Sequence, residues 1–324
     1  MTASLPGDVT IRPFAGTDLT PVRRLWNRCV PAAPIDRDRF VERVLLDPNV
    51  EPDGRLVAER DGSIVGFVLG IIQRRPLDVE AVDERTAWIS MLFVAPNHRR
   101  EGIGTALVEH VAAYAASNGR QKLRVGNYLP HYFVPGPPAD RDGTIAFFEA
   151  LGFETDHEPV AMGGSIESYR IPEDVRDRRA TLNAEGVEIR SVTAADVPEL
   201  LAMLRDHFHP DWVRAARTHL RTNPWSAVLV AVRDDAVIGW CQFGTTEPGR
   251  FGPYGVIPAE RGQGIGTVLF HACLARMRER GVRYAWLQWT SPDGSAAEVY
   301  RSVGLDVTQQ WQVVGVDLAG LIED

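Results

Sequence analysis

The sequence predicts an α/β protein built from two tandem domains, each a mixed, mostly antiparallel sheet flanked by helices. The main observation is a motif that occurs at residues 94–107 and again at residues 256–269. Both copies read Val-x-Pro-x-x-Arg-x-x-Gly-x-Gly-Thr-x-Leu, with an apolar, strand-like run before and a helical pattern after. The length of 324 residues also suits two domains better than one.

Each half begins with the same elements in the same order. A short strand, an Asp that we expect to act as a helix N-cap, and a helix are followed by a hairpin whose turn lies between β-branched runs. The strands are residues 9–12 and 187–190, the caps are Asp18 and Asp196, the helices are 19–30 and 197–207, and the hairpin turns are Asp61-Gly62 and Asp234-Asp235.

After the motif, each half continues with a helix whose apolar residues recur every fourth position, a strand, and a short helix. Between the halves, residues 171–186 are rich in charge and lack strand periodicity, which is typical of a linker or an exposed helical connector. We therefore expect an N-terminal domain at residues 1–175, a linker at 176–186 and a C-terminal domain at 187–324.

Charge, hydropathy and cysteine content limit the cellular compartment and the classes of partner that we expect. A net charge of −8 disfavours nucleic acid as a partner. Neither a signal peptide nor an apolar run near the ~18 residues of a membrane span is evident, so no membrane is expected. The three cysteines, Cys29, Cys241 and Cys273, are odd in number and widely spaced, which favours a reducing compartment over a disulfide framework. We expect a cytoplasmic monomer or homodimer.

A Gly-rich turn between a strand and a helix suits a phosphate, because unpaired backbone N–H groups and the helix dipole both favour an anion there. Two well-known phosphate motifs do not fit. A P-loop requires a lysine before the threonine, and Thr105 and Thr267 follow Gly instead. A dinucleotide fingerprint requires a third Gly, where the two copies carry Leu107 and Leu269. The pattern that remains is Arg-x-x-Gly-x-Gly.

With its preceding hairpin and the Tyr-x-x-x-Gly-Leu ending of the second half, this pattern resembles the GNAT superfamily of acyl-CoA-dependent N-acyltransferases. The resemblance covers both halves and implies two tandem GNAT-like domains, acetyl-CoA as the acyl donor, and no metal. It places the CoA pyrophosphate on the backbone amides of both loops, where Gly lets the backbone approach closely. The implied CoA-binding residues are Val94, Arg99, Arg100, Gly102, Ile103, Gly104 and Thr105 in the first half, and Val256, Arg261, Gly262, Gln263, Gly264, Ile265, Gly266 and Thr267 in the second.

The resemblance further implies that the strand before each loop diverges from its neighbour. The pantetheine arm then pairs with free backbone groups of residues 91–94 or 254–256. A main-chain N–H there polarises the thioester carbonyl, a role worth about 10²-fold or more in rate.

The two halves differ at the position that the resemblance places beside the thiol group of CoA. The family places a Tyr four residues before the closing Gly, where its hydroxyl protonates the departing CoA thiolate. The second half has Tyr300 at this position, and the first half has Phe148, which has no proton to donate. We therefore expect catalysis in the C-terminal half and a weak or non-catalytic CoA site in the N-terminal half.

The general base and the acceptor site are less well defined by the sequence. In this superfamily a carboxylate often accepts the amine proton through water, and the candidates are Glu247 and Asp293. The acceptor is expected near the segment between the first two helices of the second half. A His-x-His pair in that segment lacks a third ligand with matching spacing, so we expect no metal. The candidate acceptor contacts are His207, His209, Asp211, Trp212 and Tyr254.

The aromatic and proline-rich residues 127–140, together with residues 251–256, resemble tandem GNAT proteins that acetylate amino sugars. Tandem relatives that acylate the amine of a small thiol-bearing glycoside are a second precedent. The leading prediction is an enzyme that transfers acetyl from acetyl-CoA to a primary amine of a small molecule, such as an amino sugar or related metabolite, by direct attack in a ternary complex. The alternatives are a non-catalytic acyl-CoA-binding sensor or interaction module, and a protein N-acetyltransferase.

Overall fold

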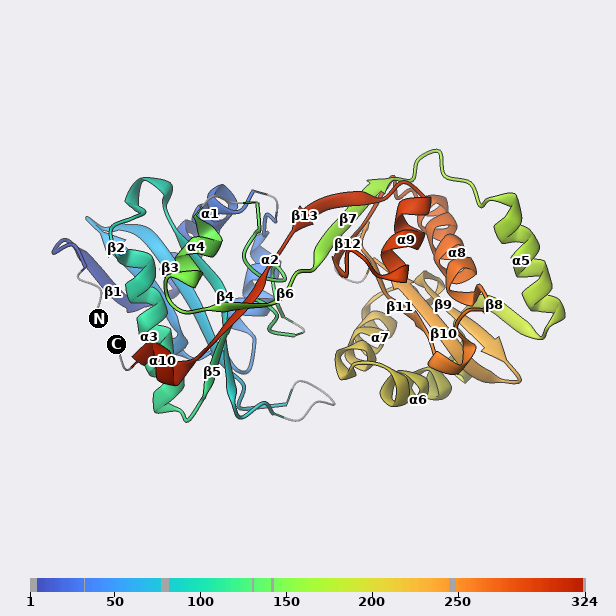
Figure 1. Ribbon diagram of the computed structural model, residues 1–324, viewed down its shortest axis with the longest axis horizontal. Helices are drawn as coiled ribbons and strands as arrows, with labels where there is room; N and C mark the ends of the chain where they lie inside the picture. The colour runs from blue at the N-terminus through green and yellow to red at the C-terminus, as the bar shows by residue number, and fades with distance from the viewer. Residues whose placement is uncertain are drawn as a thin grey trace. The chain divides into compact units, whose positions relative to one another are not determined.

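The computed structural model describes residues 5–31, 33–76, 82–129, 131–140, 143–244, 247 and 249–322 (Figure 1). The described residues fall into two compact units. The first contains the chain up to Pro159 and the segment from Gln310 onward, and the second contains Val160–Gln309. Each unit has a sheet with helices on both faces, so the predicted fold class is confirmed.

The first unit is organised around a seven-stranded sheet in the order β1-β2-β3-β4-β5-β14-β6, in which only the β4–β5 pair is parallel among the pairings described. Helices α1 and α2 cover one face, while α3, α4 and α10 cover the other. The strands are β1 (Val9–Pro13), β2 (Arg55–Arg60), β3 (Ser63–Ile72), β4 (Thr86–Val94), β5 (Lys122–Val125), β6 (Glu154–His157) and β14 (Val313–Asp317). The helices are α1 (Leu19–Cys29), α2 (Arg37–Phe40), α3 (Ile103–Ser117), α4 (Thr144–Glu149) and α10 (Leu318–Ile322).

The second unit contains two smaller sheets, ordered β11-β10-β9-β8 and β12-β7-β13. Helices α6 and α7 pack on one side of the four-stranded sheet, and α9, α8 and α5 follow one another across the other side (Figure 1). The strands are β7 (Val160–Ser165), β8 (Val187–Ser191), β9 (Val228–Arg233), β10 (Ala236–Phe243), β11 (Phe251–Val256), β12 (Tyr284–Thr290) and β13 (Asp306–Gln310). The helices are α5 (Glu173–Ala184), α6 (Val197–His207), α7 (Pro210–Thr222), α8 (Ile265–Glu279) and α9 (Ser295–Ser302).

Strand alternation explains why each main sheet can be covered on both faces. In β3, Phe67, Leu69 and Ile71 join the core beneath α1 and α2, while Val68 and Ile72 join the core beneath α3. A strand that buries both faces is apolar along its buried length, as β3 is after Ser63.

The two halves of the chain exchange their last strand and helix. Strand β14 and helix α10 come from the end of the second half and complete the first unit, where β14 pairs with β5 and β6. Strand β7 and helix α5 come from the end of the first half and complete the second unit, where β7 pairs with β12 and lies beside β13. The chain therefore crosses between the units at residues 159–160 and at residues 309–310.

This exchange corrects the expected domain boundaries of 1–175, 176–186 and 187–324. The expected linker lies largely within α5, which packs on α8 and β8. Its buried side chains are Val175 and Leu182, seven residues apart, and the rest of its surface is largely charged. With only two buried apolar residues, the helix has the sequence pattern of an exposed connector, which is why it was predicted to be a linker.

The local signals at the start of each half are mostly confirmed. Helix α1 ends one residue before the predicted helix and α6 matches it. Both residues of each predicted hairpin turn have positive φ, as a type I′ turn requires: 49° and 71° at Asp61 and Gly62, and 49° and 64° at Asp234 and Asp235.

The predicted Asp N-caps are corrected in detail. Asp18 and Asp196 end short 3₁₀ turns, and their carboxylates accept hydrogen bonds from backbone N–H groups at the start of those turns, Ala15 at 2.8 Å and Thr193 at 2.7 Å. Each carboxylate also accepts two hydrogen bonds from one guanidinium, that of Arg12 in the first unit and that of Arg190 in the second. The sequence identified the capping residue but not the turn that it caps.

Candidate active site

The two Gly-rich loops have the geometry that the motif predicts. Helices α3 and α8 each begin after a Gly in the left-handed conformation, Gly102 at φ 82° and Gly264 at φ 76°. The loops share a second left-handed position two residues earlier, which Arg100 occupies at φ 65° and Gly262 at φ 79°. The first backbone N–H groups of each 15-residue helix have no partner within the helix, so both loops can receive an anion.

The motif arginines have a role in holding these loops that the sequence did not indicate. The Nε of Arg99 donates to the carbonyl of Val94 at 3.1 Å, and the Nε of Arg261 donates to the carbonyl of Val256 at 3.0 Å. Each arginine thus ties its loop to the end of the preceding strand. This repeated contact gives a structural reason for Arg in both copies of the motif.

A second arginine supports each loop, and sequence reasoning missed it. Arg233 contacts the carboxylate of Glu260 at 2.5 Å and the side chain of Gln263 at 3.0 Å. Arg60 occupies the same place in the first unit, where it pairs with Glu101 at 2.7 Å. The available signal was that both arginines come directly before a hairpin turn in the repeat.

The strand before each loop diverges from its neighbour, as expected. In the first unit, β4 pairs with β5 only from Thr86↔Lys122 to Ile89↔Val125, so residues 91–94 extend past the β5 ladder. In the second unit, β11 and β12 belong to different sheets, and an isolated bridge joins Arg250, the residue before β11, to Trp286 of β12. A register shift interrupts the pairing of each diverging strand with its other neighbour, and such bulges redirect backbone groups.

An aromatic cluster lies beside this gap in the second unit. Tyr300 of α9 contacts Phe251 of β11 with ring centroids 5.3 Å apart, Phe270 of α8 at 5.2 Å and Tyr254 of β11 at 6.0 Å. The side chain of Tyr300 is 5% exposed, and its hydroxyl hydrogen-bonds to that of Tyr254. The second unit therefore contains the Gly-rich loop, the gap between β11 and β12, and the hydroxyl of Tyr300 together.

Burial sets the protonation state of both tyrosines. It raises the pKa of Tyr300 well above its ordinary value and that of Tyr254 to about 12. Both hydroxyls therefore keep their protons throughout the neutral range, which suits a proton donor.

A sequence model of the Acetyltransferase (GNAT) family matches residues 19–153 and residues 197–305 of the chain. This chain belongs to the GNAT acetyltransferase family. The mycothiol acetyltransferase of Saccharomonospora viridis is 28% identical to it over 289 residues, covering 81% of this chain and 87% of that protein.

Solved structures show the same tandem fold. A tandem GNAT protein from the clavulanic acid biosynthesis pathway aligns with a TM-score of 0.66 at 18% identity, over 96% of this chain and 98% of the other. The GCN5-related glucosamine N-acetyltransferase region of a fungal multi-domain GH3 β-N-acetylglucosaminidase aligns with a TM-score of 0.80 at 22% identity. That match covers 96% of this chain and 38% of the fungal one, so the acetyltransferase spans well under half of that protein.

The expected acceptor residues of this acetyltransferase separate into two groups. His209 and Trp212 lie at the start of α7, and Trp212 stacks on Phe208 with ring centroids 4.6 Å apart. A Cβ added to Gly255 would meet both rings, so they cover β11 from the α6–α7 side. Tyr254, the adjacent residue of β11, instead faces α8 and α9. The structure therefore places Tyr254 with Tyr300 and not with Trp212.

The structure also shows the surroundings of the polar residues expected to contact the acceptor. The Nδ1 of His209 lies 2.7 Å from a carboxylate oxygen of Asp211, and burial raises the pKa of that carboxyl. His207 is exposed at the end of α6. Within the described part of the chain, no three His, Cys, Asp or Glu side chains gather as metal ligands would. Sequence reasoning missed Phe208 and Gly255, whose proximity depends on the packing of α7 on β11.

The candidate bases lie on two loops of the second unit. Glu247 is partly buried in the connection between β10 and β11, where its carbonyl accepts the N–H of Arg250 at 3.0 Å. Asp293 is exposed in the turn before α9.

The gap in the first unit is small. It forms a cavity of about 80 Å³ lined by Ser90, Met91, Phe148 and Trp311, among others. Phe148 packs on Phe153 with ring centroids 5.4 Å apart and occupies the position that Tyr300 has in the second unit. The hydroxyl of Ser90 and the indole N–H of Trp311 are buried and have no hydrogen-bond partner among the described residues.

Part of the aromatic and proline-rich segment lines this cavity, namely Val134, Gly136, Pro137 and Pro138. A Cβ on Gly126 would collide with the carbonyl of Pro135, and the N–H of Gln312 donates to the carbonyl of Pro137 at 2.9 Å. Tyr128 and Phe133 are each 1% exposed and belong to the core beneath α1. These two aromatic side chains therefore pack the first unit, and their faces are not open to a sugar.

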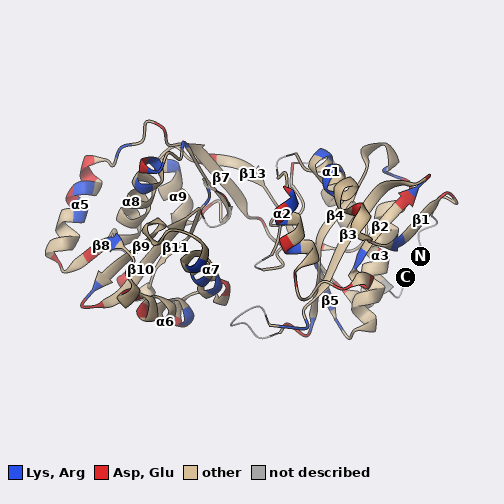
Figure 2. Ribbon diagram, turned by 180° about the vertical axis from the view of Figure 1, so that it is seen from behind, with Lys and Arg blue, Asp and Glu red and all other residues tan. Residues whose placement is uncertain are grey.

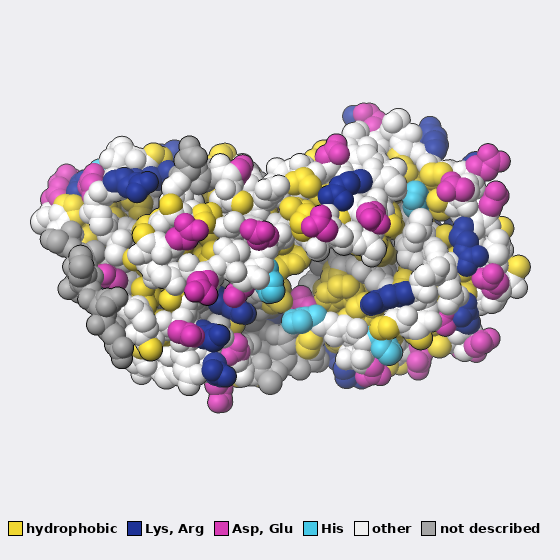
Figure 3. Space-filling model, viewed as in Figure 1, with side chains coloured by type: hydrophobic (Ala, Val, Ile, Leu, Met, Phe, Trp, Pro, Cys, Tyr) yellow, Lys and Arg dark blue, Asp and Glu magenta, His cyan; other side chains and the backbone are white. Residues whose placement is uncertain are grey.

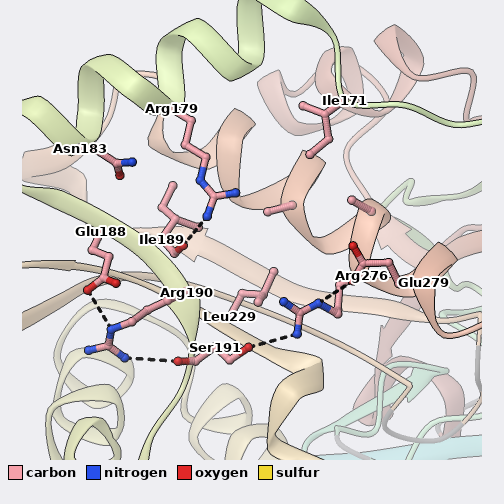
Figure 4. A pocket seen from close by; sticks show the side chains of 12 residues that line it. Ile171, Arg179, Asn183, Glu188, Ile189, Arg190, Ser191, Leu229, Arg276 and Glu279 are labelled. Atoms are coloured by element: carbon pink, nitrogen blue, oxygen red, sulfur yellow. Dashed lines mark hydrogen bonds and ion pairs between the residues drawn. The ribbon is translucent and has the colours of Figure 1, made fainter.

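A larger pocket lies elsewhere in the second unit, between α5, β8 and α8 (Figure 4). Its volume is about 380 Å³, and three arginines line it. Arg179 donates to the carbonyl of Ile189 at 2.8 Å, Arg190 contacts Glu188 at 3.1 Å, and Arg276 contacts Glu279 at 3.1 Å. The first contact joins α5 to the edge strand β8, and the other two lie within β8 and within α8. None of the three forms part of the loop-and-gap geometry.

Proposed function

We propose that this acetyltransferase transfers the acetyl group of acetyl-CoA to the primary amine of a small molecule, and that the second unit carries out the reaction. The observation that carries the proposal is the buried Tyr300 hydroxyl beside the strand gap, in the same unit as an intact Gly-rich loop. The first unit has a similar loop but carries Phe148 in place of the hydroxyl.

Each group in the second unit has a separate role in the proposed reaction. Backbone N–H groups at the start of α8 hold the pyrophosphate, and the free edge of β11 aligns the pantetheine arm. The thioester supplies an activated acetyl group. A backbone N–H of β11 polarises its carbonyl while the amine attacks the carbonyl carbon. The C–N bond forms, the C–S bond breaks, and Tyr300 donates its proton to the departing thiolate.

The amine must lose a proton in the same reaction, and a carboxylate of the second unit is the acceptor. Glu247 is the stronger candidate because it is partly buried in the loop that leads into β11, whereas Asp293 is exposed to solvent. Partial burial limits competition from bulk water for the proton that the amine releases.

The acceptor molecule binds, on this proposal, at the α6–α7 side of β11. Phe208 and Trp212 supply an apolar surface there, and the His209–Asp211 pair supplies polar contacts at the start of α7. Aromatic and polar groups in this combination suit an amino sugar or a related metabolite. The relatives named mycothiol acetyltransferases support a small-molecule acceptor, because 28% identity extends over 81% of the chain.

Surface charge favours a small acceptor over a polyanion or a protein. Acidic and basic side chains are interspersed on the face seen in Figure 3. Helix α7, beside the proposed acceptor site, contains several basic residues (Figure 2), whereas a lysine-containing protein target favours an acidic groove. Among the described residues, no helix has the length and apolar character needed to span a bilayer.

Thiol release from acetyl-CoA tests the proposed function. Purified protein is incubated with acetyl-CoA and pools of amino sugars, polyamines, amino acids or aminoglycosides, and free CoA thiol is measured over time. Amine-dependent release with an acetylated small molecule detected by mass spectrometry supports the enzyme. Tight CoA binding without release in any pool supports the acyl-CoA-binding sensor instead, and acetylation confined to added proteins supports the protein acetyltransferase.

A further inference from the structure

Helix α5, which the sequence suggested was a linker, lies against the Gly-rich loop of the second unit. The Nε of Arg178 donates to the carbonyl of Gln263 at 2.7 Å. A Cβ added to Gly264 would lie 3.1 Å from that Nε and 3.2 Å from the Cγ of Arg178. The arginine side chain therefore packs directly on Gly264, the residue that precedes α8, in the space that a side chain there would need.

The charge of Arg178 is only weakly neutralised within the protein. Its anchor is an uncharged carbonyl, and a carboxylate oxygen of Glu185, a half-exposed residue, lies 3.5 Å from its guanidinium. By contrast, Arg233 on the same loop is paired with Glu260 at 2.5 Å. The side chain of Arg178 is 34% exposed, so the rest of its guanidinium is accessible to a ligand on the loop.

The neighbouring arginines of α5 do not share this position. Arg179 turns into the pocket beside β8 and donates to the carbonyl of Ile189 (Figure 4). Arg176 is exposed. A helix rotates about 100° per residue, so consecutive arginines must point in different directions, and the packing of α5 on α8 decides which one meets the loop.

In the described part of its exchanged helix, the first unit has no counterpart of Arg178. Helix α10, which follows β14 as α5 follows β7, reads Leu-Ala-Gly-Leu-Ile and carries no charge. Among the described residues, an arginine of the exchanged helix therefore meets the Gly-rich loop only in the unit that contains the Tyr300 hydroxyl.

We propose that Arg178 is a donor-binding residue that contacts the pyrophosphate of acetyl-CoA on the second Gly-rich loop. This inference rests on the proposed function, because it takes that loop as the CoA site. The Nε–carbonyl bond holds the guanidinium in place before the donor arrives, which reduces the entropy lost on binding. The remaining N–H groups then donate to phosphate oxygens as charge-assisted hydrogen bonds. The end of the first half of the chain thus contributes to the active site of the second half, and favours donors that carry the phosphates over simple pantetheine thioesters.

Calorimetry with CoA and with pantetheine tests this proposal. The parent protein carries Gly104→Asp in the first loop, so that the titration reports the second unit, and the variants add Arg178→Gln, Arg178→Lys or the matched control Arg176→Gln. We expect Arg178→Gln to raise the Kd for CoA about 10-fold, within the range for one charge-assisted phosphate contact, and to leave pantetheine binding unchanged. Arg178→Lys should recover part of the loss, and Arg176→Gln should match the parent. Because the contact is ionic, the dependence of log Kd on log salt should be shallower in Arg178→Gln.

Three results overturn the inference in distinguishable ways. If the parent binds CoA and Arg178→Gln binds it equally well, Arg178 is no ligand while the proposed function stands. If Arg178→Lys loses as much affinity as Arg178→Gln and the salt dependence is unchanged in both, Arg178 only braces the loop. If the parent itself binds no CoA although its melting curve shows a folded protein, the proposed function fails together with this inference.

Discussion

The sharpest test of the active site is Tyr300→Phe, which removes one oxygen atom from the aromatic cluster of the second unit. Tyr300 is 5% exposed and packs on Phe251 and Phe270 at centroid distances of 5.3 Å and 5.2 Å, contacts that a phenylalanine preserves. The change leaves the hydroxyl of Tyr254 without its partner, at a cost of about 1 kcal/mol. For a unit of this size, such a loss lowers Tm by roughly 2–4 °C, so the variant should fold.

The catalytic effect should be much larger than the effect on stability. If Tyr300 protonates the thiolate, kcat should fall about 10²-fold, which corresponds to about 2.7 kcal/mol of transition-state stabilisation. The assay is thiol release from acetyl-CoA with a productive amine. An acyl donor whose leaving thiol is more acidic should reduce the defect, because its thiolate needs the proton less. Phe148→Tyr in the first unit is the matched control and should leave the rate unchanged.

The pH dependence of stability gives an independent check on the same residue. Burial raises the folded-state pKa of Tyr300 above its unfolded value near 10, so the protonated hydroxyl stabilises the fold fully below pH 10 and that contribution is lost as pH rises above it. Tyr300→Phe removes one such group, and its melting temperature should therefore fall less steeply than that of the wild type above pH 10. Full activity of Tyr300→Phe, with a normal melting curve, would mean that the tyrosine is only a core residue and that the second unit has another acid or none.

Three further predictions concern the loops, the fold and the base. Gly264→Asp puts a side chain at φ 76° and a negative charge at the pyrophosphate position, so turnover should be abolished, while Gly104→Asp should lower CoA stoichiometry in calorimetry and largely spare the rate. Asp196→Asn should lower the free energy of unfolding by about 2 kcal/mol in urea titrations at pH 7, because the Arg190 guanidinium holds the pKa of that carboxyl well below its usual range. That contribution is present above the unfolded pKa near 4 and is lost as pH falls through the folded value, so the two proteins should converge in strong acid. Glu247→Gln should lower kcat/KM in the thiol-release assay, whereas Asp293→Asn should not, and the reverse outcome would assign the base to Asp293.

Much of the fold was predictable because the chain repeats its local signals. The positive-φ hairpin turns at Asp61 and Asp234, the helices after Asp18 and Asp196, and the loops at Gly102 and Gly264 all depend on neighbouring residues, and all are present. Local conformational preferences act over a few residues, so one copy of the chain suffices to indicate them.

The site was predictable only in part. The contrast between Tyr300 and Phe148 was visible in the sequence, but the hydrogen bond that joins Tyr300 to Tyr254 was not. Tyr254 and Gly255 are adjacent in β11 yet face opposite sides of it, and the side that each faces depends on the strand register. Phe208 was missed because its contact with Gly255 depends on how α6 and α7 pack on β11, which the sequence does not show.

The sequence by itself determined that this protein has two GNAT-like halves, each with a Gly-rich loop and a diverging strand, and that the halves differ at the thiol end. Only the tertiary structure decided which segments complete each unit. The exchange of β7 and α5 for β14 and α10 joins residues far apart in the chain, and it brings Arg178 to the loop at Gln263. Pairing between strands distant in sequence depends on which free sheet edge each one meets, and no local pattern in either strand records that choice.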